Sequence, residues 1–417
     1  MDWLSFCQAV LPALAALLFV WTTVQGARRV CVPALQADGE KREAWDKKAT
    51  LTAGLLLFTA CAGGAAFFAL CALDANPGEP LEQALHSVFP TSMDADHYIQ
   101  LAKYGYGAGE DFPGQYLMIV FFPLFPWLLR LVCGITGLGG YTAGLLIQPV
   151  LFAVGGMALY RIVQPRFGRA AAGETLVLLC LLPGSFFFAA PMTESLYFAL
   201  SMLAFACMES GRPAAFAGFG FLAALTRSTG GLLAGAAGVL WLMRLRRKEK
   251  AAPWLAAALG PAAGTGAYLL LNWHCYGDCF AFSAIQKAHW SQGLGWVGDT
   301  LRYHLHYLVS WWESNRSFSL YVSLLAVVLI LAQLLTMALC SKKMPVPWLA
   351  YSMAYLLVAD GATWLLSAPR YALSLPFFPL GVVLLCKKRW QKAAVVWVTA
   401  LIGALYLRKY LLYGPIY

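Results

Sequence analysis

A short run of ionisable and aromatic residues, Asp94-Ala95-Asp96-His97-Tyr98, is the part of the sequence best suited to catalysis. If this run is helical, Asp94, His97 and Tyr98 share one face, with Leu101 one turn further along. A carboxylate beside a histidine is suited to act as a general base, which typically contributes a rate factor of about 10²–10⁴. The same aspartate could instead cap the start of an interfacial helix, which is a common structural role. The spacing alone leaves both interpretations open.

Asp94 and Asp96 together also match the short Asp-x-Asp pattern that holds a divalent metal beside sugar phosphates. Two acids at this spacing occur often by chance, and a metal site normally needs further ligands. The sequence around them offers no cluster of three clear ligands. We therefore expect no cofactor, with Asp96 as the candidate ligand if a divalent metal takes part.

Three other charged residues, Glu194, Arg227 and Arg370, stand at the ends of apolar runs. A charge at the centre of a membrane helix costs about 2.5–3.5 kcal/mol, so charges kept near such runs need an explanation. Each of them could simply extend to the membrane interface. Together with His289 they are predicted to lie on the non-cytoplasmic side of the membrane. Arginines are unusual there, because Lys and Arg are normally enriched in cytoplasmic loops. This one-sidedness favours a shared anionic ligand.

The composition supports a membrane protein. Of the 417 residues, 60% are hydrophobic and only 12% are charged, whereas soluble domains carry about 25% charged residues. Apolar runs of about 20 residues recur along almost the whole chain, which predicts an all-α, multi-pass integral membrane protein. The net charge of +10 comes from short basic clusters between these runs, the pattern that marks cytoplasmic loops and not a nucleic-acid surface.

These clusters give a topology of roughly 11–13 transmembrane helices. A first span before residue 25 and a cytoplasmic linker form an additional segment, residues 1–48, followed by a single membrane domain, residues 49–417. Two large loops, about 74–141 and 273–317, are expected on the non-cytoplasmic side. Phe121–Val132 is apolar but contains two prolines, which predicts a short outer-leaflet helix instead of a full span. The further spans are expected near 49–73, 142–161, 174–190, 193–209, 214–226, 229–245, 252–272, 318–340, 346–367, 371–386 and 393–410.

The eleven cysteines lie mostly inside apolar runs, where a free thiol behaves as a small hydrophobic group. Cys275 and Cys279 lie together in a polar loop, and the sequence leaves open whether they form a disulfide.

Several segments, taken in order, resemble the GPI mannosyltransferase 2 family (phosphatidylinositol glycan class V type) and its bacterial homologues. No single motif is specific, but the ordered set extends from about residue 90 to 375. The segments are Asp94–Tyr98 with the following Ile99–Tyr106, Phe121–Pro126, Pro191–Leu196, Leu225–Ser228, Gly277–Phe282 and Ala368–Tyr371. Two departures stand out, because Met93 replaces the usual tryptophan and Asp96 occupies a position where the family tolerates many residues.

The resemblance implies the C-type glycosyltransferase architecture, with a catalytic aspartate in the first outer loop, here Asp94. It implies transfer of a hexose, mannose in such a family, from a polyprenyl-phosphate donor to a hydroxyl of a lipid or glycan acceptor. A single displacement would invert the anomeric carbon. The site would lie on the extracytoplasmic side of the plasma membrane, among membrane lipids.

Seven residues are predicted to bind the substrates of this reaction. Arginine presents a planar fork of donors that suits a phosphate. The residues are His97, Tyr98, Glu194, Arg227, His289, Arg370 and Tyr371. The alternative is a transporter or flippase of a lipid-linked or anionic solute, which would place ionisable groups near the midplane and often shows an inverted repeat. The charges here lie at span ends, and no repeat is evident.

Overall fold

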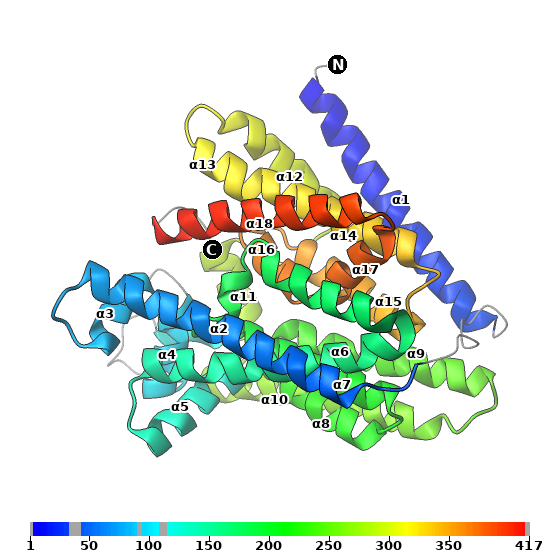
Figure 1. The fold of residues 1–417 in the computed structure, drawn as a ribbon, viewed down its shortest axis with the longest axis horizontal. Coiled ribbons are helices and arrows are strands. Elements are labelled where there is room, and N and C mark those ends of the chain that lie inside the picture. Colours follow the sequence, from blue (N-terminus) through cyan, green and yellow to red (C-terminus); the bar gives the residue numbers. More distant parts are fainter. Residues whose placement is uncertain (1–2, 33–42, 90–93, 108–114, 413–417) are drawn as a thin grey trace.

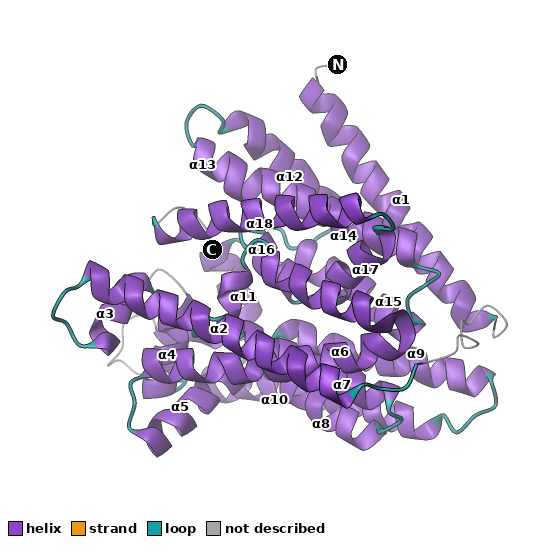
Figure 2. Ribbon diagram, viewed as in Figure 1, coloured by secondary structure: helices purple, strands orange, loops and turns teal. Residues whose placement is uncertain are grey.

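The chain is described by a computed structural model over residues 3–32, 43–89, 94–107 and 115–412. Within these ranges it consists of helices joined by turns and loops and has no β-strand; extended backbone pairs in an isolated bridge between Leu294 and Ala362 (Figure 2). Met93, which replaces the family tryptophan, lies outside the described residues.

The helices are packed into a single bundle (Figure 1). In chain order the α-helices are α1 (Trp3–Cys31), α2 (Lys47–Ala75), α3 (Leu81–Val88), α4 (Asp94–Tyr104), α5 (Leu124–Thr136), α6 (Gly140–Leu181), α7 (Glu194–Glu209), α8 (Pro213–Ala224), α9 (Leu233–Arg246), α10 (Ala252–Tyr276), α11 (Ala281–Trp290), α12 (Val297–Ser310), α13 (Arg316–Phe318), α14 (Leu325–Cys340), α15 (Val346–Tyr355), α16 (Ala368–Leu373), α17 (Phe377–Leu385) and α18 (Arg389–Leu411). The 3-10 helices are η2 (Gln115–Val120), η3 (Ser185–Phe188) and η4 (Ser228–Leu232), and the π-helices are η5 (Ser319–Leu324) and η6 (Leu356–Asp360).

Seven helical segments of the described chain are long and apolar enough to cross a membrane. They are Leu4–Cys31, Lys47–Ala75, Gly140–Leu181, Ser228–Arg246, Ala252–Tyr276, Arg316–Cys340 and Arg389–Leu411. Apolar side chains lie exposed along them, as Leu55 and Leu70 of α2 illustrate with 66% exposure each. Surfaces of this kind suit contact with lipid and not with water. The prediction of an all-α polytopic membrane protein is confirmed.

The longest helix, α6, contains the predicted span 142–161 and only the first part of the predicted span 174–190, because it ends at Leu181 and a turn and η3 follow. It bends at Gly168, whose φ of +85° is outside the helical range. Pro165 just before it removes a backbone donor, so the sequence itself explains the break. The N-terminus of α6 is bound by Glu82 of α3, whose carboxylate accepts from the backbone N–H of Tyr141 and Thr142 at 2.8 and 3.0 Å. A carboxylate stabilises the orphan donors at the start of a helix.

The first predicted outer loop folds as α3, α4, η2 and α5. Helix α5 begins after Pro123 and is only 13 residues long, as the proline-broken pattern predicts. Helix α4, which begins at Asp94, packs on α5 and α6. These elements are grouped at one end of the bundle in Figure 1. The catalytic candidate therefore lies on a short helix supported by two others.

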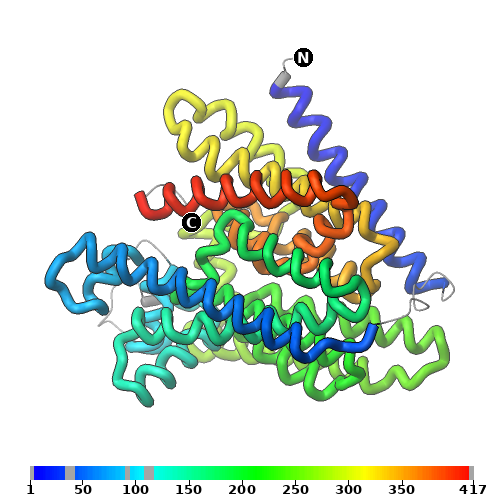
Figure 3. The backbone as a smooth tube through the Cα atoms, in the orientation of Figure 1, coloured from blue at the N-terminus to red at the C-terminus, as the bar shows by residue number. Residues whose placement is uncertain are grey.

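Shorter helices cover several other predicted spans. Helices α7 and α8 lie between α6 and α10, and most side chains of α7 are buried by protein. The predicted span 346–367 divides into α15, η6 and a turn, and 371–386 divides into α16 and α17. The second predicted loop, 273–317, contains α11 and α12. Helix α1 packs on α12, α14 and α15, and its N-terminal end extends beyond the rest of the chain in Figure 3.

Candidate active site

Glu194 is the centre of a buried ion-pair network. Its Oε1 accepts from Nε of Arg370 at 2.8 Å and from Nη2 of Arg227 at 2.9 Å. The Glu194 side chain is fully buried, and its other oxygen, Oε2, has no hydrogen-bond partner among the described residues. One carboxylate oxygen thus bridges two guanidinium groups from distant parts of the chain.

Asp94 joins this network through Arg370. The Nη1 atom of Arg370 lies 2.6 Å from Oδ2 of Asp94. Arg370 exposes 7% of its side chain, whereas Asp94 exposes 34%. Asp94 is therefore the accessible edge of a site whose interior is formed by Glu194 and Arg370.

Arg227 is held by a second set of partners. Its Nη1 donates to Oγ of Ser374 at 2.6 Å, and its guanidinium lies 6.0 Å from the ring of Tyr371. Ser374 and Tyr371 both come from the segment that carries Arg370. The two arginine motifs, 143 positions apart in sequence (370 − 227), therefore meet in one place.

The four charges of the network, Asp94, Glu194, Arg227 and Arg370, sum to zero. Each guanidinium uses two of its five N–H donors in these contacts. The structure places the arginines beside carboxylates and leaves donors for an additional anion. A phosphate would bring the only unbalanced charge into this set.

The neighbouring backbone explains how these side chains reach one another. Gln148 of α6 donates its amide to the carbonyl oxygens of Ala190 and Met192 at 2.6 and 2.7 Å, which fixes the turn that ends at Glu194. At the junction of α8 and η4, a Cβ on Gly230 would lie 2.2 Å from the carbonyl oxygen of Ala223. Only glycine allows this approach, which directs the chain at Arg227.

The electrostatic surroundings act on Asp94 in opposite directions. Burial alone would raise its pKa, but the Arg370 guanidinium, with smaller contributions from His97 and Arg227, outweighs burial and lowers the pKa below its ordinary value. A carboxylate with a lowered pKa is ionised at neutral pH. Asp94 is therefore in the form that accepts a proton.

Asp96 has a different environment from Asp94, although it is only two residues away. Its side chain is buried, and Oδ1 accepts from the hydroxyl of Tyr141 at 2.8 Å. Its Oδ2 accepts from the amide of Gln100. The contact with Tyr141 ties α4 to α6, and the contact with Gln100 lies within α4. The sequence did not reveal this structural role.

Among the described residues, no group of three or more His, Cys, Asp or Glu side chains is arranged to hold a metal ion. Cys275 and Cys279 are free thiols.

Aromatic side chains form a wall beside Asp94. The His97 ring lies 5.0 Å from Phe121, and the Tyr98 ring lies 5.2 Å from Phe121 and 5.4 Å from Phe125. The Nδ1 atom of His97 is buried without a hydrogen-bond partner among the described residues. Burial and the charge of Asp94 raise the pKa of Tyr98. Tyr98 therefore remains a neutral hydroxyl close to the network.

His289 lies further out than the other predicted residues. It is exposed on α11, and its ring is 6.2 Å from that of Trp290, which lies 6.5 Å from Phe121. It is thus connected to His97 through two aromatic rings. Asp94, His97, Tyr98, Glu194, Arg227, Arg370 and Tyr371, by contrast, gather around one site.

Sequence reasoning did not find three residues that complete this site. Ser374 binds Arg227, Gln148 fixes the turn before Glu194, and the ring of Phe187 lies 5.1 Å from the guanidinium of Arg370. Ser374 follows Arg370 by one helical turn, a spacing that was available in the sequence. Neither Gln148 nor Phe187 carries a comparable signal, because each reaches the site only through tertiary packing.

Comparison with known proteins gives one assignment. Residues 56–244 match the family model of the mannosyltransferase (PIG-V) family. This range contains Asp94, His97, Glu194 and Arg227, whereas Arg370 lies beyond it. No curated protein matches the chain. Over residues 56–244, just under half of its length, the chain is similar to the mannosyltransferase (PIG-V) family.

Proposed function

We propose that the chain transfers mannose from a polyprenyl-phosphate donor to a hydroxyl of a lipid or glycan acceptor, with Asp94 as general base. The observation that carries this proposal is the contact of Arg370 with both Asp94 and Glu194. It brings a partly accessible carboxylate next to a guanidinium that still has donors for a phosphate. The family match supports mannose as the sugar.

The proposed reaction is a single displacement. The acceptor oxygen forms a bond to C1 of the mannose, and the bond from C1 to the phosphate oxygen breaks, with its electron pair leaving on the phosphate. The hydroxyl proton passes to the Asp94 carboxylate. Attack opposite the leaving group inverts the anomeric carbon.

Arg370 has two tasks in this scheme. It stabilises the charge that develops on the leaving phosphate, an effect that is large in a partly buried site. It also sets the basicity of Asp94. A phosphate bound to Arg370 weakens the field of the guanidinium at Asp94, which raises the pKa of this carboxylate when the donor is present. The base is thus strengthened by the arrival of its substrate.

The shape of the site suits a sugar entering from the Asp94 side. Asp94 exposes 34% of its side chain, whereas Glu194 is fully buried, so the substrates would approach from α4. Trp290 is only partly buried and could offer a ring face to a mannose, whereas Tyr98 and Phe121 are buried behind it. His97 would orient the acceptor. The basic clusters predict that this end of the bundle is extracytoplasmic.

The direct test is to incubate the purified full-length protein with polyprenyl-phosphate [¹⁴C]mannose and a hydroxyl acceptor. We expect the label to leave the lipid and to appear in a product of inverted configuration. The Asp94→Asn variant, which keeps nearly the same size, is the matched control. Failure of the label to leave any polyprenyl-phosphate sugar, in protein shown to be folded, would contradict the proposal. Transfer of lipid-linked label across vesicles without cleavage would point to the flippase alternative.

A further inference from the structure

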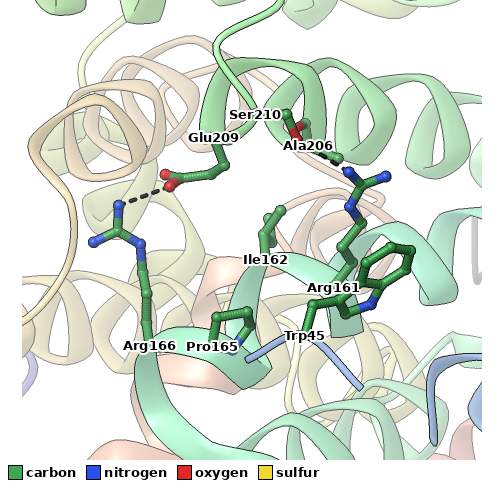
Figure 4. Close-up of a pocket in the computed structure, with 8 residues that line it drawn as sticks. All are labelled: Trp45, Arg161, Ile162, Pro165, Arg166, Ala206, Glu209 and Ser210. Carbon is green, nitrogen blue, oxygen red and sulfur yellow. Dashed lines mark hydrogen bonds and ion pairs between the residues drawn. The ribbon is translucent and has the colours of Figure 1, made fainter. Parts of the chain in front are cut away.

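A small cavity lies at the other end of α7 from Glu194. It has a volume of about 190 Å³, and Figure 4 shows the side chains that line it. Glu194 begins α7 and Glu209 ends it, so the two sites are about 22 Å apart along the helix at 1.5 Å per residue. The cavity is therefore separate from the candidate active site.

Two arginines of α6 face each other across this cavity (Figure 4). Arg166 Nη2 lies 2.7 Å from Oε2 of Glu209, and Arg161 Nη2 donates to Oγ of Ser210 at 3.2 Å. The Nε atom of Arg166 is buried and has no hydrogen-bond partner among the described residues. A buried guanidinium donor without a partner is costly, and an anion in the cavity would satisfy it.

Positive charge exceeds negative charge around the cavity. Arg161 and Arg166 line it together with a single acid, Glu209. The guanidinium of Arg161 lies 4.5 Å from the ring of Trp45, and the nearby carboxylates of Asp46 and Glu43, which do not line the cavity, contact Arg169 and Gln164. An anion is the ligand that this balance favours.

The size of the cavity limits the ligand. A volume of about 190 Å³ is below the roughly 300–1,000 Å³ of pockets that enclose drug-sized ligands. Water occupies about 30 Å³ in the liquid, so the cavity has room for a phosphate group with a few attached atoms.

The lining indicates where the rest of the ligand lies. Trp45 is 39% exposed, and tryptophan favours the level of the lipid headgroups. Just beyond it, Leu51 and Leu55 of α2 expose 65% and 66% of their surfaces. A chain that leaves the cavity past Trp45 would therefore run along an apolar helix face.

We propose that this cavity binds the phosphate of an anionic phospholipid, whose acyl chains lie along α2. Arg161 and Arg166 provide the donors, and Trp45 marks the interface. The basic clusters predict that this end of the bundle is cytoplasmic, where anionic lipids and basic pockets between helices meet. The proposal does not depend on the reaction at Asp94.

The test uses the purified full-length protein in neutral detergent. Native mass spectrometry measures retained lipid, and thermal unfolding measures stabilisation, during titration with phosphatidylglycerol, phosphatidylcholine or inorganic phosphate. We expect phosphatidylglycerol to bind and to raise the melting temperature, and phosphatidylcholine to do neither. Equal effects of the two lipids would overturn the proposal. Full protection by inorganic phosphate alone would show a soluble anion site and would overturn the lipid assignment.

Variants then locate the binding. We expect Arg166→Gln and Arg161→Gln each to weaken phosphatidylglycerol binding about fivefold, the effect of one basic residue near an anionic lipid. Glu209→Gln should strengthen it, because the competing carboxylate is removed. Arg246→Gln, which removes an exposed arginine of α9 outside the cavity lining, is the matched control and should change little.

The opposite effects expected of Arg161→Gln and Glu209→Gln on lipid binding keep the proposal testable if Arg166→Gln fails to fold. Tighter binding by Glu209→Gln together with weaker binding by Arg161→Gln would support it. An equal loss in Arg161→Gln and Arg246→Gln would indicate general attraction to the anionic surface and would contradict it.

Discussion

Nη1 of Arg370 lies 2.6 Å from Oδ2 of Asp94, although the two residues are 276 positions apart in the chain. The contact joins the first predicted outer loop to a short helix near the C-terminus. It lowers the pKa of Asp94, and in the proposed mechanism Arg370 also binds the phosphate of the donor. Binding of the donor and activation of the acceptor would therefore meet in one pair of side chains.

The base can be tested with Asp94→Asn, which keeps the size of the side chain and removes the proton acceptor. We expect turnover to fall at least about a hundredfold, the lower end of the general-base range, with donor binding retained. Asp96→Asn is the control, because Asp96 contacts Tyr141 and Gln100. The turnover of Asp96→Asn should fall far less than that of Asp94→Asn. The assignment would be reversed if the variant at 94 kept more than a tenth of the rate while that at 96 was inactive, and two active variants would make Glu194 the next candidate.

The acid limb of the pH profile reports on Asp94. Its pKa is lowered below the ordinary value of 3.8, so kcat/KM should be insensitive to this group near neutral pH and should fall only as the pH drops through the lowered pKa. The stabilisation that accompanies the lowered pKa is present above the unfolded-state value and is lost over the same acidic range. Arg370→Gln removes the main lowering influence and leaves burial, so the acid limb should move to higher pH. An unmoved limb in folded Arg370→Gln would show that another group controls it.

The arginines can be tested through donor binding. We expect Arg227→Ala and Arg370→Ala to weaken binding of the polyprenyl-phosphate donor, and lysine to restore it only in part, because an ammonium lacks the planar fork. Isothermal titration or a spin-labelled donor analogue would measure this. Wild-type donor affinity in both alanine variants would make the arginines structural.

Stability gives a separate readout for the same pair. Arg370→Ala leaves the fully buried Glu194 with one guanidinium partner fewer, and breaking a buried pair costs about 3–5 kcal/mol. The melting temperature of Arg370→Ala should therefore fall more than that of Arg227→Ala, since Arg227 is 14% exposed against 7% for Arg370. Equal melting temperatures would argue against the central role of Arg370 in the network.

Chelation tests the part played by metal. We expect turnover to survive EDTA, because both arginines keep N–H donors for the phosphate oxygens of the leaving group. Complete loss, restored by manganese or magnesium, would contradict this and would make Asp96 a ligand, which would require its contacts with Tyr141 and Gln100 to break.

The membrane fold could be predicted from the sequence because each span is a local property. About twenty apolar residues form a helix in lipid whatever the rest of the chain does, since the backbone has no other partner there. The prolines at 123 and 126 likewise predicted the short α5. Asp94, Glu194, Arg227 and Arg370 were predicted to be functional because charged residues are unusual beside apolar runs. The sequence could not show that one carboxylate oxygen of Glu194 accepts hydrogen bonds from both arginines. Nor could it show that Asp96 accepts a hydrogen bond from Tyr141 of α6.

The tertiary structure alone decided which helices face one another. Asp94 and Arg370 meet only because α4 and α16 pack against the same part of the bundle, and Arg161 meets Trp45 only because α6 passes the start of α2. Such contacts arise from the packing of side chains between segments that are far apart in sequence. Local sequence patterns, such as helical periodicity, do not predict which distant segments will pack together. Charge and hydropathy determined that this chain lies in a membrane, and helix packing determined where its ionisable groups come together.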